Sequence, residues 1–477
     1  MVGMKSSYLL LLCLCCTVAA QVQNRPTFRS RKAEPPLAVV DVQVIPMTRA
    51  GVLQNQTVII EQGRITRIGP TASVRLPRRA QRIDGRGKYL MPGLTDFHVH
   101  LREPSELLAY LAHGVTTVVH LSGPLLNIPD VLALRRRINA GEALGPNLYA
   151  SGRILDGQPP IFPNVSTVVT TAAEAERAVT EQQQAGVDFI KVYNNLEPEV
   201  LQAVVAAARQ RGLAVVGHIP RKAGRAQALQ TALAAGQTMI AHAEELFFTY
   251  FYAETDSLLA QGRAPQPDLS RLPQVVQWLR EAKVFVTPDL VFTALQLRQL
   301  EQPEAIFAEP EARLTHPAIL NMWRQQSPGR RADRDRFELR ERAKYAFLQE
   351  LTRALLQGGV PLLLGTDAST AGLLPGKSAH WELQELVRAG LTPWQALATG
   401  TNNPGRFVQR HVRGATAFGT VARGQRADLL LLEANPLADI HHLERIAGIV
   451  VRGRWFAKEE LASLRRSAAR AFPNQER

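Results

Sequence analysis

The sequence predicts an α/β protein in which a (β/α)8 TIM barrel carries a small β-sandwich domain built from both ends of the chain. Two features of its 477 residues predict this fold. In the middle of the chain, short apolar runs alternate with segments whose apolar residues recur at helical spacing, the pattern of successive parallel βα units. Short runs typical of strands also lie near both termini, and together they can complete one small domain.

Residues 1–20 are predicted to be a secretory signal peptide. Lys5 precedes the apolar run Tyr8–Cys16, and the small residues Val18–Ala20 supply a cleavage site before Gln21. The run is too short to span a membrane, so we expect export to the periplasm or the extracellular space. A lipid anchor on one of the three cysteines, which all lie in this segment, is the alternative. The predicted mature chain therefore has no cysteine ligand or nucleophile.

The mature chain is predicted to begin with a loose polar leader at residues 21–36. Strand-like runs then occur near both ends, at 37–45, 57–61, 65–69, 424–432 and 446–454. We assign residues 37–91 and 413–456 to the composite β-sandwich and residues 92–412 to the barrel. Residues 457–477 are the predicted C-terminal tail.

Eight barrel strands are predicted, near 94–99, 115–120, 147–151, 187–193, 213–218, 237–242, 283–287 and 361–366. Amphipathic helices are predicted between them, at 172–184, 198–211 and 225–235. The interval from residue 289 to residue 358 is unusually long, helical and charged. This interval either forms a cap over the barrel mouth or packs outside the barrel, away from the site.

A pair of histidines at the end of the first barrel strand is the first candidate functional feature. In Phe97-His98-Val99-His100 the two histidines are two residues apart, so in a strand their side chains point to the same face. Two neutral imidazoles held on one rigid face are half of a zinc-type site. The pair alone is weak evidence, because His-x-His arises readily by chance in a chain with 11 histidines.

Four further polar residues lie at or just beyond the ends of predicted barrel strands, and they are Lys191, His218, His242 and Asp367. The C-terminal ends of the strands meet at one mouth of a (β/α)8 barrel, and enzymes with this fold have their active sites there. Each residue has a structural alternative, such as a hydrogen-bonded core histidine or an aspartate that caps the next helix. A lysine inside an apolar strand is costly unless it is paired or neutralised. Together they predict a polar site at the mouth.

These residues, in this order, resemble the amidohydrolase superfamily of metal-dependent hydrolases over about residues 37–456. The resemblance implies two divalent metal ions, with His98, His100 and Asp367 on one, His218 and His242 on the other, and a CO₂-carboxylated Lys191 bridging both. Zinc is the expected metal, although imidazole and carboxylate ligands also suit manganese, iron or cobalt.

The implied ligand set predicts a mechanism. Two metals roughly 3.5–4 Å apart share a bridging hydroxide that attacks the substrate carbonyl. Asp367 is the expected catalytic residue, taking the proton as general base and passing it to the leaving nitrogen as general acid. Tyr193 shares a strand face with Lys191 and is predicted to polarise the carbonyl or hold a substrate carboxylate, with wall packing as the alternative.

Residues 217–220 and 376–383 resemble the branch with prolidase-like dipeptidases and imidazolonepropionase-related hydrolases, and Lys191 favours the peptidase-like side. We therefore expect a hydrolase of amide or peptide C–N bonds that acts on dipeptides or N-acyl amino acids. Hydrolysis of a cyclic amide or lactone is the alternative, followed by a non-catalytic metal-binding protein. The candidate substrate contacts are Tyr193, His120 and Arg153, with Arg221 as a further anion binder.

The overall charge does not predict a nucleic-acid partner. The chain has a formal net charge of +14, but its basic residues are dispersed. The densest stretch, residues 330–342, interleaves acids with arginines, as a solvated, salt-bridged helix face does. No membrane span is expected after the N-terminal segment, and homo-oligomerisation is left open. Most of the remaining histidines are interpreted as surface or structural residues: His113, His120, His316, His380, His411, His441 and His442.

Overall fold

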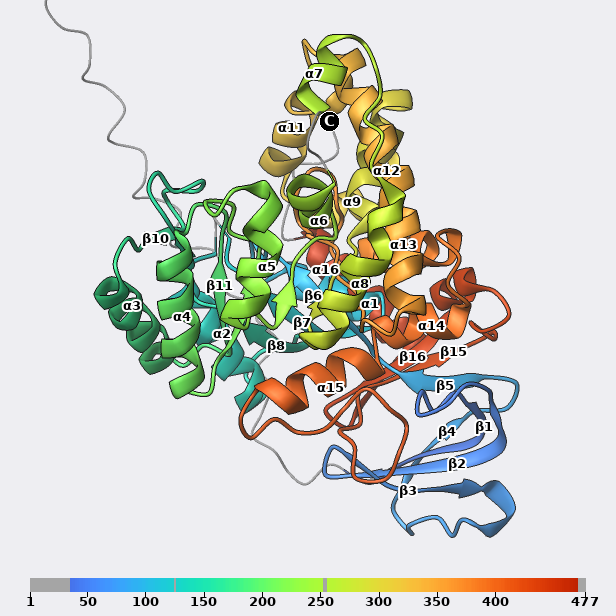
Figure 1. Ribbon diagram of the computed structural model, residues 1–477. Coiled ribbons are helices and arrows are strands. Elements are labelled where there is room, and N and C mark those ends of the chain that lie inside the picture. Colours follow the sequence, from blue (N-terminus) through green and yellow to red (C-terminus); the bar gives the residue numbers. More distant parts are fainter. Residues whose placement is uncertain (1–34, 124–125, 252–254, 471–477) are drawn as a thin grey trace, which may run out of the picture.

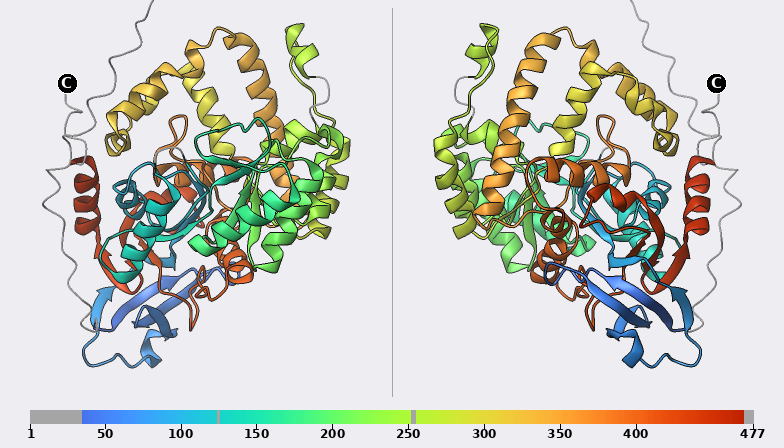
Figure 2. Two further views of the ribbon diagram at one scale, coloured as in Figure 1. Left: turned by 90° about the vertical axis from the view of Figure 1, so that its left-hand side faces the viewer. Right: turned by 90° about the vertical axis from the view of Figure 1, so that its right-hand side faces the viewer.

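The computed structural model describes residues 35–123, 126–251 and 255–470. The predicted signal peptide, residues 1–20, and most of the predicted leader lie outside these ranges. A mixed sheet lies at one end of the molecule, parallel strands covered by helices lie in the middle, and a helical arm projects from the other end (Figure 1; Figure 2). Within the described ranges, no helix has the length and apolar character needed to cross a membrane.

Both ends of the chain contribute to one eight-stranded mixed sheet, whose order is β17-β16-β15-β5-β1-β2-β3, with β4 beside β1. Its strands are β1 (Leu37–Val44), β2 (Leu53–Glu61), β3 (Arg64–Pro70), β4 (Gln81–Asp84), β5 (Tyr89–Pro92), β15 (Leu429–Leu432), β16 (Ile446–Val451) and β17 (Arg454–Ala457). Val39 and Val58 from the N-terminal strands pack with Leu431 and Val450 from the C-terminal strands in one apolar cluster. The two packed layers of the predicted sandwich and the domain boundaries stay predictions.

The parallel strands form two ladders, β6-β7-β8 and β10-β9-β11-β12-β13-β14. Their bounds are β6 (Leu94–Val99), β7 (Val115–His120), β8 (Asn147–Ala150), β9 (Ile154–Asp156), β10 (Ser166–Val168), β11 (Phe189–Val192), β12 (Ala214–Gly217), β13 (Met239–Ile240) and β14 (Phe285–Val286). Seven of the eight predicted barrel strands are therefore present, although β13 and β14 are only two residues long. The short strands β9 and β10 were not predicted.

The eighth predicted strand, residues 361–366, is not a regular strand. Pro361 has no N–H to donate, and the segment makes only isolated bridges. The segment still bonds to both ladders: it donates an N–H to the carbonyl of Val286 (2.9 Å) and accepts one from Phe97 (2.7 Å). A continuous, closed eight-stranded barrel is thus not observed in the described residues. The structure has two parallel ladders in an α/β arrangement, with this segment between their outer strands.

Helices cover the outer face of the parallel strands, and five of them are α2 (Ile128–Ala140), α3 (Ala172–Ala185), α4 (Pro198–Gln210), α5 (Arg225–Ala235) and α8 (Leu272–Glu281). The predicted helices at 172–184, 198–211 and 225–235 are confirmed as α3, α4 and α5. Helix α3 begins at a capping box, in which Thr171 accepts the N–H of Glu174 and Glu174 accepts the N–H of Thr171. A local sequence signal therefore marks the start of this helix.

Residues 290–357 form a helical arm, made of α9 (Leu290–Glu301), α10 (Ala305–Ala308), α11 (Pro317–Gln325) and α12 (Arg334–Gln357). The arm projects on the side opposite the mixed sheet (Figure 2). It starts directly after Asp289, just beyond β14, so its base adjoins the C-terminal ends of the parallel strands. Arg342 pairs with Glu338 (2.8 Å) and Glu301 (2.9 Å), as expected for a salt-bridged helix face. Within the predicted C-terminal tail, residues 458–470 form α16 (Lys458–Arg470).

The cluster shared by both chain ends should be essential for stability. Leu431→Ala removes a 1% exposed side chain from that cluster and should lower the free energy of unfolding by about 3 kcal/mol, measured by urea unfolding. The control Leu269→Ala truncates a leucine that is 48% exposed and should change the free energy by no more than about 0.5 kcal/mol. Equal effects of the two substitutions would contradict the role given to the cluster.

Candidate metal centre

The six predicted metal ligands lie at the C-terminal ends of the parallel strands and in the segment after them. Two come from β6 and its end, three from β11, β12 and β13 or just beyond them, and one from the irregular segment: His98, His100, Lys191, His218, His242 and Asp367. The ring centroids of His98 and His100 are 5.1 Å apart, those of His98 and His242 4.5 Å, and those of His218 and His242 5.1 Å. The structure therefore brings the four imidazoles together.

The first group combines His98, His100 and Asp367. The Oδ1 atom of Asp367 lies 3.3 Å from Nε2 of His98 and 2.9 Å from Nε2 of His100. These three side chains have the spacing needed to hold one metal ion. The Nδ1 atom of His100 hydrogen-bonds the carbonyl of Ser122, which places a proton on Nδ1 and turns Nε2 towards Asp367, where Nε2 can act as a ligand once it carries no proton. The local geometry thus suits the predicted first metal.

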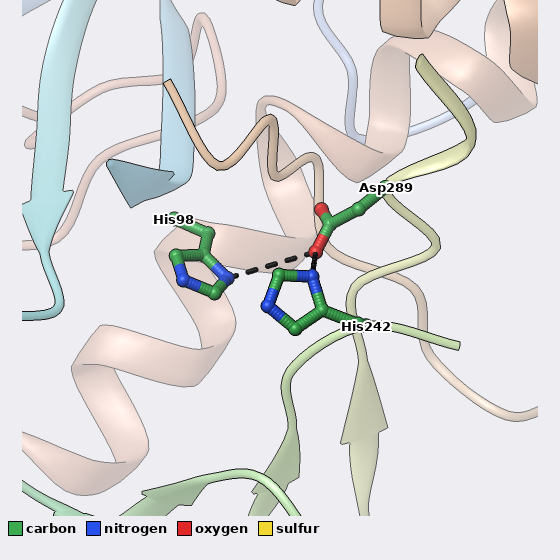
Figure 3. Close-up of side chains that lie close together, drawn as sticks. All are labelled: His98, His242 and Asp289. Atoms are coloured by element: carbon green, nitrogen blue, oxygen red, sulfur yellow. Dashed lines mark ion pairs between the residues drawn. The ribbon is translucent and has the colours of Figure 1, made fainter. Parts of the chain in front are cut away.

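The second group with metal-binding spacing in the described residues is His98, His242 and Asp289 (Figure 3). The Oδ2 atom of Asp289 lies 2.7 Å from Nδ1 of His242 and 3.6 Å from Nδ1 of His98. Thr287 also donates its hydroxyl to Oδ2, at 2.9 Å. This group differs from the predicted second set, because Asp289 takes part and His218 and Lys191 do not.

Asp289 is a functional candidate that the sequence reasoning missed. It follows β14 much as Asp367 follows the eighth segment, with a threonine shortly before it in each case. That repeated strand–Thr–Asp pattern was a signal that could have found it. Asp289 makes no side-chain cap hydrogen bond to α9, the helix that begins directly after it. Its carboxylate is turned towards the histidines.

Carboxylates hold both histidines of the predicted second metal. Glu245, which the sequence analysis also did not predict, places Oε1 2.9 Å from Nδ1 of His218. Asp289 faces Nδ1 of His242 in the same way. Metal-binding histidines commonly pair their second ring nitrogen with a carboxylate, which orients the ring. Burial lowers the pKa of His218 to about 4, although Glu245 partly opposes this. Burial also acts to lower the pKa of His242, but the charge and hydrogen bond of Asp289 outweigh it and raise the pKa to about 9.

Lys191 is buried without an ion-pair partner among the described residues. Its side chain is 2% exposed, and Nζ donates to the carbonyl of Leu121 at 2.9 Å. Burial lowers the pKa of this amine to about 8, despite the opposing charges of Asp367 and Asp289. A substantial fraction of the amine is therefore neutral near physiological pH.

The donor set fits a divalent metal. Imidazole and carboxylate groups are the ligands that zinc and related first-row metals take in proteins. Burial holds the pKa of His98 well below its usual value, so its ring is neutral, as a ligand must be. The buried Oδ1 atom of Asp289 has no hydrogen-bond partner in the described part of the chain. This arrangement of donors and an unpartnered carboxylate oxygen is compatible with bound metal.

The three predicted substrate contacts differ in their position. Tyr193 lies beside the imidazoles, with its ring centroid 3.9 Å from that of His218. His120 is fully buried and accepts the N–H of Leu101 at Nδ1, and its centroid is 6.4 Å from that of His100. Arg153 is exposed. Its guanidinium donates to two backbone carbonyls, one just before β10 and one at the first residue of β10. The structure does not group Arg153 with the imidazoles.

Two further arginines adjoin the site. Arg102, which the sequence reasoning missed, lies two residues after His100 and donates Nε to the carbonyl of Ser369 at 2.6 Å. Burial lowers the pKa of Arg102, and the charges of Glu106 and Asp367 act in the opposite direction. Arg221, the alternative anion binder, is engaged by Glu245 at 2.5 Å. Of the two arginines, Arg102 is therefore the one whose charge interacts with the carboxylate of Asp367, the predicted catalytic residue.

Known proteins are similar to this chain in sequence or in overall fold. The ochratoxinase of Aspergillus niger is 22% identical over 89% of this chain and 87% of its own length. A bottromycin amidohydrolase structure has a TM-score of 0.70 and 25% identity, covering 91% of this chain and 90% of that one. A Xaa-Pro dipeptidase structure with bound methionine has a TM-score of 0.66 and 18% identity, covering 88% of this chain and all of the other; at this identity the likeness shows the fold alone.

Another curated relative is matched over only a small part of its length. The adenine deaminase of Deinococcus radiodurans is 34% identical, but the match spans 24% of this chain and 22% of that protein. The sequence profile of the amidohydrolase family, in contrast, matches residues 89–456, which include all six predicted ligands. This chain therefore belongs to the amidohydrolase family and is a hydrolase that acts on carbon–nitrogen bonds.

Proposed function

We propose that the protein hydrolyses the amide or peptide bond of dipeptides or N-acyl amino acids with a binuclear metal centre. The observation that supports this proposal best is the convergence of four imidazoles and Asp367, together with a nearby buried lysine that interacts electrostatically with them and lacks an ion-pair partner in the described residues. An ordinary core would not bury so many ionisable groups without a compensating ligand. The names of the similar proteins, which include an amidohydrolase and a dipeptidase, support the same bond type.

In this proposal the parallel strands and the irregular segment at residues 361–366 correspond to the strands of a (β/α)8 barrel. The ligands are divided between two metals as the family resemblance implies. His98, His100 and Asp367 would hold one ion, and His218 and His242 would hold the second. Two bound zinc ions would supply Lewis acids for the scissile carbonyl and a water of lowered pKa as the nucleophile. Asp289 and Glu245 orient the rings of His242 and His218 through their Nδ1 atoms.

Carboxylation would turn Lys191 from a buried cation into an anionic ligand. A neutral amine is the form that adds CO₂, and burial already favours that form by lowering the pKa to about 8. The resulting carbamate would place a negative charge among the metal ligands, where a bare ammonium would repel the ions. The energetic problem of a buried lysine without a carboxylate partner is removed in the same step.

Asp367 is the proposed proton carrier. Burial acts to raise its pKa, but the hydrogen bond and charge of His100 outweigh burial and hold the pKa well below its usual range, so the carboxylate is ionised. Thr370 donates its hydroxyl to Oδ2 at 2.9 Å and fixes the orientation of the carboxylate. An ionised, fixed carboxylate can take a proton from the attacking water and return it to the leaving nitrogen.

The free carboxylate of the proposed substrate needs a polar partner near the mouth. Tyr193 is beside His218 and supplies a hydroxyl, and Arg102 supplies a cation near Asp367. His120 supplies a buried Nε2 without a hydrogen-bond partner in the described residues. Arg153 is the weakest candidate, because backbone carbonyls already occupy its guanidinium.

We predict that the purified protein binds about two divalent ions per chain, as measured by elemental analysis. Asp289→Asn should weaken metal binding about 10- to 100-fold, because the amide holds the His242 ring less firmly than the carboxylate does. Asp439→Asn is the matched control, since Asp439 pairs with the exposed His441 far along the chain from the centre. Metal-free protein that gains no activity on metal addition would exclude the proposed mechanism.

The two proposed roles of Lys191 and Asp367 should separate on substitution. Lys191→Ala should lower metal occupancy and reduce kcat/KM at least about 100-fold, with partial rescue by a short carboxylic acid plus bicarbonate. Asp367→Asn should keep much of the metal and still lose about 100-fold or more in kcat, because it cannot carry the proton. Lys222→Ala, which changes a lysine in a surface ion pair, should leave both quantities unchanged. Near-native rates in the first two variants would refute the assigned roles.

The substrate class is tested by a screen of N-acyl amino acids, Xaa-Pro dipeptides, cyclic amides and lactones. We expect cleavage of the first two classes, with kcat/KM reduced about tenfold when the terminal carboxylate is amidated, because a charge-assisted hydrogen bond is lost. Equal turnover of free and amidated forms would rule out carboxylate recognition. Turnover of cyclic amides or lactones alone would favour the alternative function.

A further inference from the structure

A series of aromatic rings leads from the metal centre to the protein surface. The ring of Tyr193 lies over that of His218, with centroids 3.9 Å apart. Phe162, in the loop between β9 and β10, meets Tyr193 edge to face, with centroids 5.6 Å apart. Phe162 is therefore separated by one side chain from a predicted metal ligand.

Apolar surface is concentrated on this loop. In the described ranges, four large apolar side chains are exposed, and three of them lie between residues 161 and 168. Ile161 is 48% exposed and Phe162 is 49% exposed. An aromatic ring that stays half exposed to water does not gain the free energy of full burial unless a ligand covers it.

The loop is held in one conformation rather than lying free. The buried carboxylate of Asp156 accepts the N–H groups of Gly157 (2.9 Å), Ile161 (2.8 Å) and Asn195 (2.8 Å). Asn195, two residues after Tyr193, also donates its side-chain amide to the carbonyl of Pro159 at 2.6 Å. These bonds tie the loop of Phe162 to the loop that follows Lys191 and Tyr193.

Close backbone packing reinforces this connection. A Cβ atom on Gly157 would lie 1.8 Å from the carbonyl oxygen of Asn195, so only glycine allows the two loops to approach this closely. The position of Phe162 next to Tyr193 is thus set by hydrogen bonds and packing at the base of the loop. A preorganised apolar group of this kind loses little entropy when it contacts a ligand.

We propose that Phe162, with Ile161, determines substrate specificity by forming an apolar wall at the mouth that receives a bulky apolar or aromatic group of the substrate. This inference rests on the proposed function and narrows it, because it selects N-acyl amino acids or dipeptides that carry such a group over those that carry none. The ring of the substrate packs against the exposed face of Phe162, while the scissile bond lies at the metal centre beyond Tyr193.

The experiment compares binding and turnover of N-acetyl-L-phenylalanine, N-phenylacetylglycine and N-acetylglycine by the zinc-loaded full chain. The first two probes carry a phenyl group on the amine or the acyl side of the bond, and the third carries none. We expect at least one phenyl probe to bind more tightly than N-acetylglycine. Phe162→Ala should lower that preference about three- to tenfold, and Phe162→Leu should lower it less.

Leu269→Ala is the matched control, because it truncates an equally exposed apolar side chain outside the ring series, and it should leave the preference unchanged. Thermal unfolding verifies that the Phe162 variants fold, and Phe162→Leu serves if the alanine variant does not. A phenyl preference that is absent in the wild type, or that survives loss of Phe162, overturns the inference. Absence of turnover with all probes, while the binding preference remains, contradicts the proposed function and leaves the apolar wall supported.

Discussion

The burial of ionisable side chains at the ends of the parallel strands is the constraint on which the site depends. An imidazole or carboxylate removed from water costs several kcal/mol unless a partner replaces the lost hydration. Asp367 lies against His98 and His100, and carboxylates likewise face His218 and His242. Among the six predicted ligands, Lys191 alone lacks an opposite charge within ion-pair distance in the described residues, and burial lowers its pKa to about 8. Of these six side chains, the lysine is therefore the one whose cost of burial is least compensated by the protein and most needs a further ligand.

Other buried polar residues help to hold the irregular segment against β6, where regular strand pairing is missing. The buried carboxylate of Asp96 accepts the N–H of His98 at 3.2 Å and the hydroxyl of Thr366 at 2.6 Å. These bonds tie β6 to the irregular segment that carries Asp367. Burial raises the pKa of Asp96 to about 8, although the hydrogen bond from Thr366 opposes this. Without such side-chain bonds, the approach of Asp367 to the histidines of β6 would rest on a few backbone contacts.

The residues of the candidate metal centre could be predicted from the sequence where their positions follow the periodicity of a strand. The spacing of His98 and His100 places them on one face, and a polar residue after an apolar run marks a strand end. Asp289 and Glu245 were not predicted, although they orient two of the histidines. Each lies at the start of a helix, where an acidic residue is common for local reasons, and only the folded chain shows that it faces an imidazole.

The sequence by itself determined the helices α3, α4 and α5, seven of the parallel strands and the six polar residues at their ends. These features depend on local periodicity, which acts within a few residues. Only the tertiary structure decided that the eighth segment is irregular, that backbone carbonyls hold Arg153, and that Phe162 lies beside Tyr193. Such contacts depend on which distant loops meet, and local patterns carry no information about a partner supplied from elsewhere in the chain.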